Sequence, residues 1–123
     1  MALHSRLKRV EEQIREEIAN IILKEIKDPR IGLTSVNHVH VSKDLRFAKV
    51  YVSSLERDNI STDQTVQILT RARKFIRKLL GERVVLKYLP DLEFIHDDTM
   101  KRADRINTLL NDLDREREKK EVP

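Results

Sequence analysis

The sequence predicts an α+β domain in which a small three-stranded sheet carries helices on one face. The main support is the spacing of the apolar residues, which indicates a helix, two strands, a helix, a strand and a last helix in that order. No internal repeat or low-complexity linker interrupts this order. Length and composition agree with this. A chain of 123 residues, with 39% hydrophobic and 37% charged residues, can build one modest core under a strongly solvated surface.

The first predicted element is a helix from Leu3 to Ile26. Its apolar residues follow the three-and-four spacing of a single stripe, as expected for a helix with one buried face. Asp28-Pro29 ends the helix, because the residue before a proline is pushed out of the helical region. Gly32 then completes the turn.

Two strands are predicted next, over Leu33–Val41 and Phe47–Ser53, because both runs are rich in β-branched residues. The five residues between them are few enough for a hairpin loop, so the strands should be antiparallel neighbours. In the second strand, Val50 and Val52 are expected to face the core.

The alternation of apolar residues changes within the first strand. In a regular strand Leu33, Val39 and Val41 would lie on one face of the sheet and Val36 on the other, although all four are apolar. This predicts either a β-bulge or a strand that begins later than Leu33.

A second helix is predicted over Thr65–Leu80. Ser61 and Gln64 have the spacing of a capping box ahead of it, and Gly81 is expected to stop it. The apolar stripe keeps its phase across Ala72, and no glycine adds backbone freedom there. We therefore expect the helix to continue through Ala72–Lys74 without a full break.

One further strand should be centred near Phe94, because Pro90-Asp91 splits the apolar residues on either side of it. Phe94 is expected in the core, and so is Phe75 on the second helix. A last helix, capped by Asp98 or Thr99, should follow. The residues expected to point inward from it are Ala103, Ile106, Leu109, Leu110 and Leu113. Residues 1–113 would then form a single domain, and 114–123 a charged, disordered tail.

The composition excludes several classes of function. There is no cysteine, so disulfides, thiolate zinc sites, iron–sulfur clusters and cysteine nucleophiles are ruled out, which fits a reducing compartment. Gly32 and Gly81 are the only glycines, so the glycine-rich loops that hold phosphates are not encoded. The charged first residues and the lack of a run of about 20 apolar residues predict a cytoplasmic protein without a membrane partner.

The positive charge is concentrated in one segment, on the exposed side of the second helix and just after it. There, seven basic residues stand against Glu82 alone. They are Arg71, Arg73, Lys74, Arg77, Lys78, Arg83 and Lys87. A polyanion is the natural partner of such a patch, so these seven are the candidate RNA-binding residues. With few aromatic residues in the chain, contact through phosphates and shape is favoured over base stacking.

Two groups of histidines are candidates for sites of chemistry. His38 and His40 share a face of the first strand, but without a further ligand they are interpreted as ordinary surface or sheet-edge residues. The run His96-Asp97-Asp98 is interpreted as a strand end followed by an acidic helix cap. No catalytic residue, metal site or cofactor is assigned, and an enzyme is not expected.

Three interpretations of the basic face remain open. It can bind RNA, it can dock on an acidic protein partner, or it can be a merely solvated surface. A hydrolase that uses His96 and Asp97 is a distant further alternative. Electrostatics alone does not separate the first two, because both depend on charge.

Short pieces along the chain, from about Arg6 to Leu113, carry a family resemblance. They are Arg9-Val10, Asp28-Pro29-Arg30, Val39-x-Val41-Ser42-x-Asp44-Leu45, Ala48-Lys49-Val50-Tyr51-Val52-Ser53, Ile76-Arg77, Pro90-x-Leu92-x-Phe94, Asp97-Asp98, Arg105-Ile106 and Leu109-Leu110. In this order and spacing the sequence resembles the ribosome-binding factor A family of bacterial small-subunit assembly factors.

The resemblance implies a type II KH-like fold and a non-catalytic factor that binds 16S rRNA in the free 30S subunit. It also implies a role in late subunit assembly and in maturation of the 16S rRNA 5′ end. Other assembly factors are further candidate partners, and the protein is expected to be a monomer. The family has an Ala-x-Gly kink between two helices; here the matching residues are Ala72-Arg73-Lys74, with lysine in place of the glycine. The resemblance therefore implies that the second helix bends near Ala72–Lys74.

Overall fold

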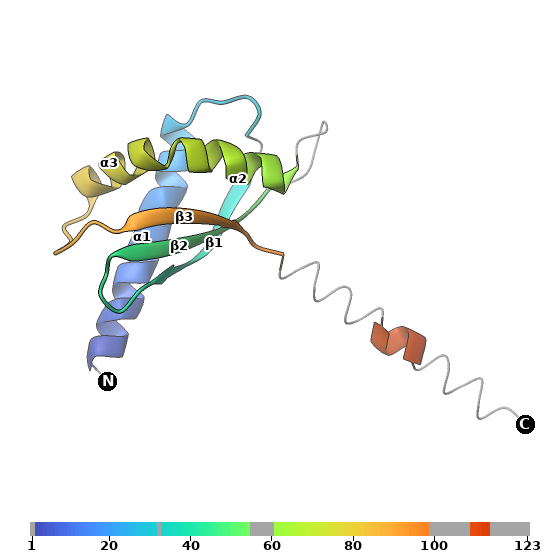
Figure 1. The fold of residues 1–123 in the computed structure, drawn as a ribbon, viewed down its shortest axis with the longest axis horizontal. Coiled ribbons are helices and arrows are strands. Elements are labelled where there is room, and N and C mark those ends of the chain that lie inside the picture. The colour runs from blue at the N-terminus through green and yellow to red at the C-terminus, as the bar shows by residue number, and fades with distance from the viewer. Residues whose placement is uncertain (1, 32, 55–60, 99–108, 114–123) are drawn as a thin grey trace, which may run out of the picture.

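The computed structural model describes residues 2–31, 33–54, 61–98 and 109–113. Its elements are α1 (Ala2–Glu25), β1 (Thr34–Val41), β2 (Phe47–Ser54), α2 (Thr62–Arg71), α3 (Arg73–Arg83) and β3 (Asp91–His96). Residues 109–113 are also helical. The predicted α+β order is confirmed, with the second helix divided into α2 and α3 (Figure 1).

The three strands form a mixed sheet in the order β1-β2-β3. β1 and β2 are antiparallel, as the hairpin loop predicted, whereas β2 and β3 are parallel. A parallel pair needs a long crossover, and here α2 and α3 supply it. In Figure 1, α2 and α3 follow one another above β3, while α1 lies behind the strands and crosses the direction of α3.

The first strand has both a late start and a β-bulge, the two predicted explanations of its changed alternation. β1 begins at Thr34, and its register with β2 shifts between Val36 and His38, which marks a bulge. The bulge lets Val36 and Val39 both reach the core although their parities differ. Leu33, which precedes the strand, is exposed.

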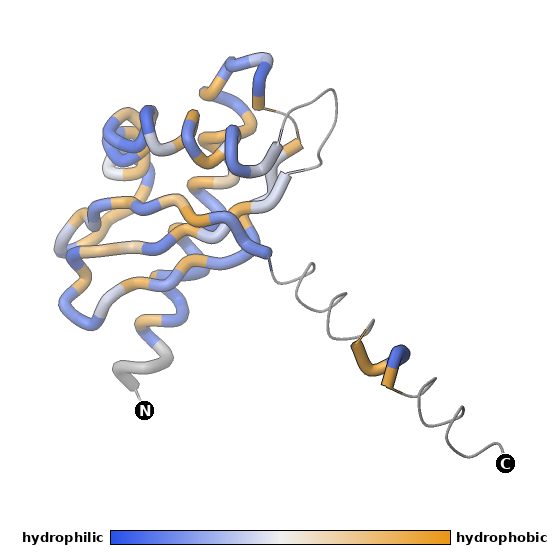
Figure 2. The backbone as a smooth tube through the Cα atoms, turned by 45° about the vertical axis from the view of Figure 1, so that its right-hand side comes forward, coloured by the Kyte–Doolittle hydropathy of each residue, from blue (hydrophilic) through white to orange (hydrophobic). Residues whose placement is uncertain are grey.

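The core lies between one face of the sheet and the three helices. Apolar and polar residues alternate along the strands in Figure 2, so a single face of the sheet is buried. Val50 and Val52 are both 0% exposed, which confirms their predicted placement, and Phe94 is 5% exposed. Phe75 is 48% exposed, so its assignment to the core was wrong. α3 fills the core with Ile76 and Leu80 instead.

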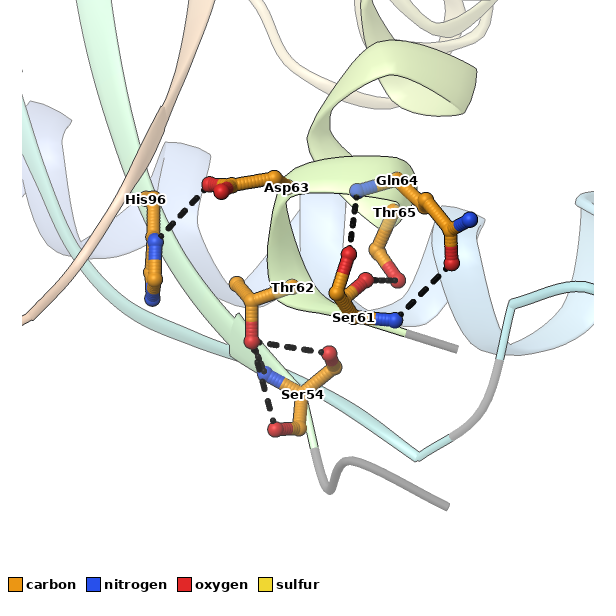
Figure 3. Close-up of polar contacts among 7 residues, drawn as sticks. All are labelled: Ser54, Ser61, Thr62, Asp63, Gln64, Thr65 and His96. Carbon is orange, nitrogen blue, oxygen red and sulfur yellow. Dashed lines mark hydrogen bonds and ion pairs between the residues drawn. The ribbon is translucent and has the colours of Figure 1, made fainter. Parts of the chain in front are cut away.

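The start of α2 is fixed by the predicted capping box. The Gln64 backbone N–H donates to the Ser61 hydroxyl at 3.2 Å, and the Ser61 N–H donates to the Gln64 side chain at 2.9 Å (Figure 3). The Thr62 hydroxyl lies 3.1 Å from that of Ser54 at the end of β2. His96 Nδ1 lies 3.1 Å from an Asp63 carboxylate oxygen. These contacts attach the start of α2 to the ends of β2 and β3.

The expectation of one unbroken helix over Thr65–Leu80 was wrong. α2 ends and α3 begins at Ala72, whose φ of −89° and ψ of 3° lie outside the helical region. Two residues earlier, the Thr70 hydroxyl donates to the Val66 carbonyl at 2.7 Å, a side-chain contact of the kind that often bends helices. The break is short, because Ala72 alone separates the two helices. Its N–H still donates to the Ile68 carbonyl at 3.1 Å, and its carbonyl accepts from the Ile76 N–H at 2.9 Å.

Gly81 does not stop the helix, contrary to the prediction, because α3 continues to Arg83. The connection to β3 explains a glycine here. A Cβ built on Gly81 would lie 3.0 Å from a Leu89 methyl carbon. The glycine therefore leaves room for the Leu89 side chain to pack against the helix.

The turn after α1 is closed by an exposed ion pair. Arg30 donates to both carboxylate oxygens of Asp28, at 3.0 Å from Nε and 2.7 Å from Nη2, and its backbone N–H adds a third bond at 2.9 Å. Side-chain hydrogen bonds from Arg30 lower the pKa of Asp28 from 3.8 to about 2.

Replacing Arg30 with glutamine is expected to raise the pKa of Asp28 back toward 3.8, as measured by NMR titration of the Asp28 carboxyl carbon. Because the native pKa lies below the ordinary value, the Asp28 contribution to stability is present above pH 3.8 and is lost as the pH falls through about 2. The Lys27→Gln variant removes a neighbouring charge and serves as the control. An unchanged Asp28 pKa in Arg30→Gln would contradict the assignment.

The predicted last helix is confirmed at residues 109–113, but the predicted placement of its leucines was wrong. Leu109, Leu110 and Leu113 are exposed, so they do not point into a core. Ala103, Ile106, Thr99 and the tail 114–123 lie outside the described residues. Within the described part of the chain, no helix has the length and apolar character needed to span a bilayer.

Candidate nucleic-acid interface

The junction of α2 and α3 presents most of the predicted basic residues to solvent. Arg71 ends α2, Arg73 and Lys74 begin α3, and Lys78 follows one turn later. All four are exposed. They surround the position at which Ala72 interrupts the helix.

An open pocket of about 400 Å³ lies between the start of α3 and the start of β3. Arg73, Lys74 and Arg77 line it from the helix, and Asp91 and Leu92 from the strand. β3 is an edge strand, so the pocket lies along a border of the sheet. Three cations and one carboxylate give it a positive balance that suits phosphate groups.

Arg77 has a structural role that sequence analysis did not detect. Its guanidinium donates to the Leu89 carbonyl at 2.8 Å and to the Pro90 carbonyl at 3.1 Å. Its Nε also lies 3.4 Å from an Asp91 carboxylate oxygen. Arg77, which the sequence assigned only to the exposed RNA-binding group, therefore also attaches the connection 84–90 to α3.

Arg83 is also engaged within the fold. Its guanidinium lies 3.2 Å from a Glu25 carboxylate oxygen and 3.9 Å from one of Glu17, both on α1. These ion pairs join the end of α3 to the first helix and offset the charge of Arg83 locally. Lys87 is exposed, with its ammonium nitrogen 5.5 Å from the centre of the Tyr88 ring.

The seven predicted residues thus divide by position. Arg73, Lys74 and Arg77 come together at the pocket, Arg71 and Lys78 flank it on the helices, and Arg83 and Lys87 lie beyond the pocket lining. Asp91 and Leu92 were not predicted as site residues. The pairing of β3 with β2 brings them opposite α3. Counting charges along the chain does not predict this pairing.

The histidines considered as sites of chemistry have other neighbours. His38 stacks on Tyr51, with ring centres 4.2 Å apart, on the exposed face of the sheet. His40 lies 3.6 Å from a Glu11 carboxylate oxygen of α1. His96 ends β3, as predicted. Among the residues that the structure describes, no group of three or more histidine, aspartate or glutamate side chains could hold a metal ion.

The fold and this surface define a class of protein. The unit β2-α2-α3-β3, preceded by α1 and β1, is a type II KH-like α+β domain with a basic junction between its two crossover helices. Lysine is tolerated at position 74, because among the described non-glycine residues only Leu45 has a positive φ. The break at Ala72 needs no glycine.

Comparison with known proteins assigns the family. The family model for ribosome-binding factor A matches residues 6–110. A ribosome-binding factor A from Halothermothrix orenii is 46% identical over 113 residues, which cover 92% of both chains. The chain belongs to the ribosome-binding factor A family.

Two structures of the Thermus thermophilus protein are similar to this one. The crystal structure of that ribosome-binding factor A has a TM-score of 0.65 at 30% identity, covering 73% of this chain and 94% of that one. A homology model of the Thermus protein, fitted into a cryo-EM map of a complex with the 30S subunit, has a TM-score of 0.62 at 29% identity. The match covers 75% of this chain and 96% of that homology model.

Proposed function

We propose that this protein is a non-catalytic RNA-binding factor that associates with the free 30S ribosomal subunit. Its role is to assist late assembly of that subunit and maturation of the 16S rRNA 5′ end. It acts in the cytoplasm as a monomer, with other assembly factors as further partners. Family membership supports this proposal, as does the similarity to a Thermus protein fitted into a 30S complex.

The observation that carries the proposal is the group of exposed cations around the α2–α3 junction. Arg73 and Lys74 line the pocket, and Lys78 lies one turn along the same helix. Side chains in this arrangement reach phosphates of a nucleic-acid backbone and release its counterions on binding. Phosphate contact positions a protein on RNA without requiring base readout.

The alternative function is docking on an acidic protein. Phe75 favours it, since this half-exposed aromatic ring lies between Arg71 and Lys78 at helical spacing. An aromatic anchor beside cations is common at protein interfaces.

Sedimentation of the protein with purified ribosomal particles tests the proposal. We expect it to migrate with free 30S subunits and to be absent from translating ribosomes. Binding to 16S rRNA stripped of ribosomal proteins separates RNA from protein recognition. Migration with 30S particles but no affinity for the stripped rRNA would favour the acidic-protein alternative, and no migration with 30S subunits would contradict the proposed function.

A further inference from the structure

The pocket between α3 and β3 contains a group that phosphate binding does not explain. The Asp91 side chain is 72% exposed at the mouth, beside Arg73 and Lys74. A carboxylate there repels phosphates and weakens a site built for them alone. The ion pair with Arg77 offsets part of this charge, and the exposed oxygens of Asp91 remain able to accept hydrogen bonds from a ligand.

The surroundings of Asp91 fix its backbone and place a cation beside its side chain. The carbonyls of Leu89 and Pro90 fix the Arg77 guanidinium, whose Nε lies 3.4 Å from Asp91 Oδ1. The Asp91 backbone is fixed as well, since its N–H donates to the Arg46 carbonyl at 2.8 Å. Arg77 therefore places a positive charge beside Asp91, and its single Nε–H is already donated to the Pro90 carbonyl. The exposed carboxylate keeps lone pairs on both oxygens for further donors.

The shape and lining of the pocket suit one nucleobase. Its volume of about 400 Å³ is within the range of small-ligand sites. Leu92, which is almost fully buried, supplies an apolar wall, and the Arg73 guanidinium can stack on a base plane. Lys74 and Arg73 carry the positive charge for the neighbouring phosphates.

The hydrogen-bond donors on each base determine which base the carboxylate can bind best. A carboxylate accepts two parallel N–H donors, and guanine is the base whose Watson–Crick edge has two adjacent donors, N1–H and N2–H. Adenine and cytosine offer one amino group each, and the single N3–H of uracil is flanked by carbonyl oxygens that repel a carboxylate. In a duplex the guanine edge is already paired, so the base must be unpaired.

We propose that this pocket binds an unpaired guanine of single-stranded RNA, with the Asp91 carboxylate accepting hydrogen bonds from guanine N1–H and N2–H. The inference rests on the proposed RNA-binding function and names the ligand of the same site. Asp91 supplies base selectivity, while Arg73 and Lys74 supply affinity that is independent of sequence.

Fluorescence anisotropy with labelled ten-nucleotide RNAs tests the inference. The probes are oligouridine and the same RNA with one central guanosine, inosine, adenosine or cytidine. We expect the guanosine probe to bind roughly tenfold more tightly than oligouridine, since a bidentate base contact discriminates by about that factor or more. Inosine lacks the N2 amino group and should fall between the two.

Variants of Asp91 test the preference for guanosine, which would not change if Asp91 had only a structural role. Asp91→Asn and Asp91→Ala should abolish the preference for guanosine, while affinity for oligouridine stays equal or rises because a negative charge is lost. Glu93→Ala is the matched control, because it removes an exposed carboxylate two residues along β3 that does not line the pocket. It should keep the preference. Thermal melting of each variant verifies folding.

The outcomes separate this inference from the proposed function. Equal binding of all five probes, or a preference that survives in Asp91→Ala, would overturn the guanine site and leave RNA binding intact. Migration with 30S subunits without affinity for any probe would likewise overturn only the guanine site. Failure to bind both the probes and the 30S subunits would overturn both.

Discussion

Replacing Val50 with aspartate is expected to unfold the domain. Val50 is completely buried on the central strand β2, where it pairs with Val39 of β1 and Phe94 of β3. An unpaired carboxylate at that position costs several kcal/mol, which is comparable to the total stability of about 5–15 kcal/mol of a small domain. Circular dichroism should show the loss of the cooperative thermal transition.

The same substitution at an exposed valine provides the control. Val85 lies in the connection between α3 and β3 and is 100% exposed. Val85→Asp should therefore change the free energy of unfolding by no more than about 0.5 kcal/mol. If Val50→Asp melted cooperatively near the temperature of the parent protein, the assignment of the core face of β2 would be wrong.

Reversing Arg73, Lys74 and Lys78 to glutamate is expected to abolish binding to free 30S subunits while the fold stays intact. These side chains are exposed, and no ion pair among the described residues involves them within the fold. Arg77 is left unchanged, because its reversal would break its contacts to Leu89 and Pro90. Sedimentation measures the binding, and thermal melting measures the fold.

Salt dependence gives a second measurement of the same variant. Each neutralised phosphate contributes about 0.7 to 0.9 to the slope of log affinity against log salt, so three lost contacts should flatten the slope by roughly two to three. Affinity for stripped 16S rRNA, where still measurable at low salt, provides the slope.

A control with the same change in net charge tests whether position matters. Lys8, Lys24 and Lys43 are exposed and lie outside the pocket lining. Their reversal to glutamate should weaken binding much less. If this control lost 30S binding while the helix variant retained it, the RNA-facing surface would have been misassigned and the basic face of α3 would be a solvated surface.

Local sequence patterns were sufficient for most of the fold. The apolar stripe of α1, the capping box at Ser61 and the hairpin between β1 and β2 all depend on residues within a few positions of each other. The phase change at Val36 predicted the bulge for the same reason. Steric and hydrogen-bonding rules act over such distances, so the sequence displays them directly.

The position of the helix irregularity was predicted, but its extent was not. The stripe continues in phase through Ala72, which indicated a continuous helix, and the family resemblance placed a bend there. Beside the break the Thr70 hydroxyl turns back to the Val66 carbonyl, a rotamer choice that periodicity does not reveal.

For the candidate site, the sequence by itself determined the concentration of positive charge, and the tertiary structure decided how each cation is used. Arg77 contacts residues 12 to 14 positions away, and Arg83 pairs with Glu25, 58 positions away. The parallel pairing of β2 and β3 brings Asp91 to the pocket, and the filling of the core by Ile76 and Leu80 leaves Phe75 exposed. Such contacts form only when distant segments pack together. Their energy depends on residues far apart in the sequence, whereas helix and strand propensities depend on each residue and its neighbours.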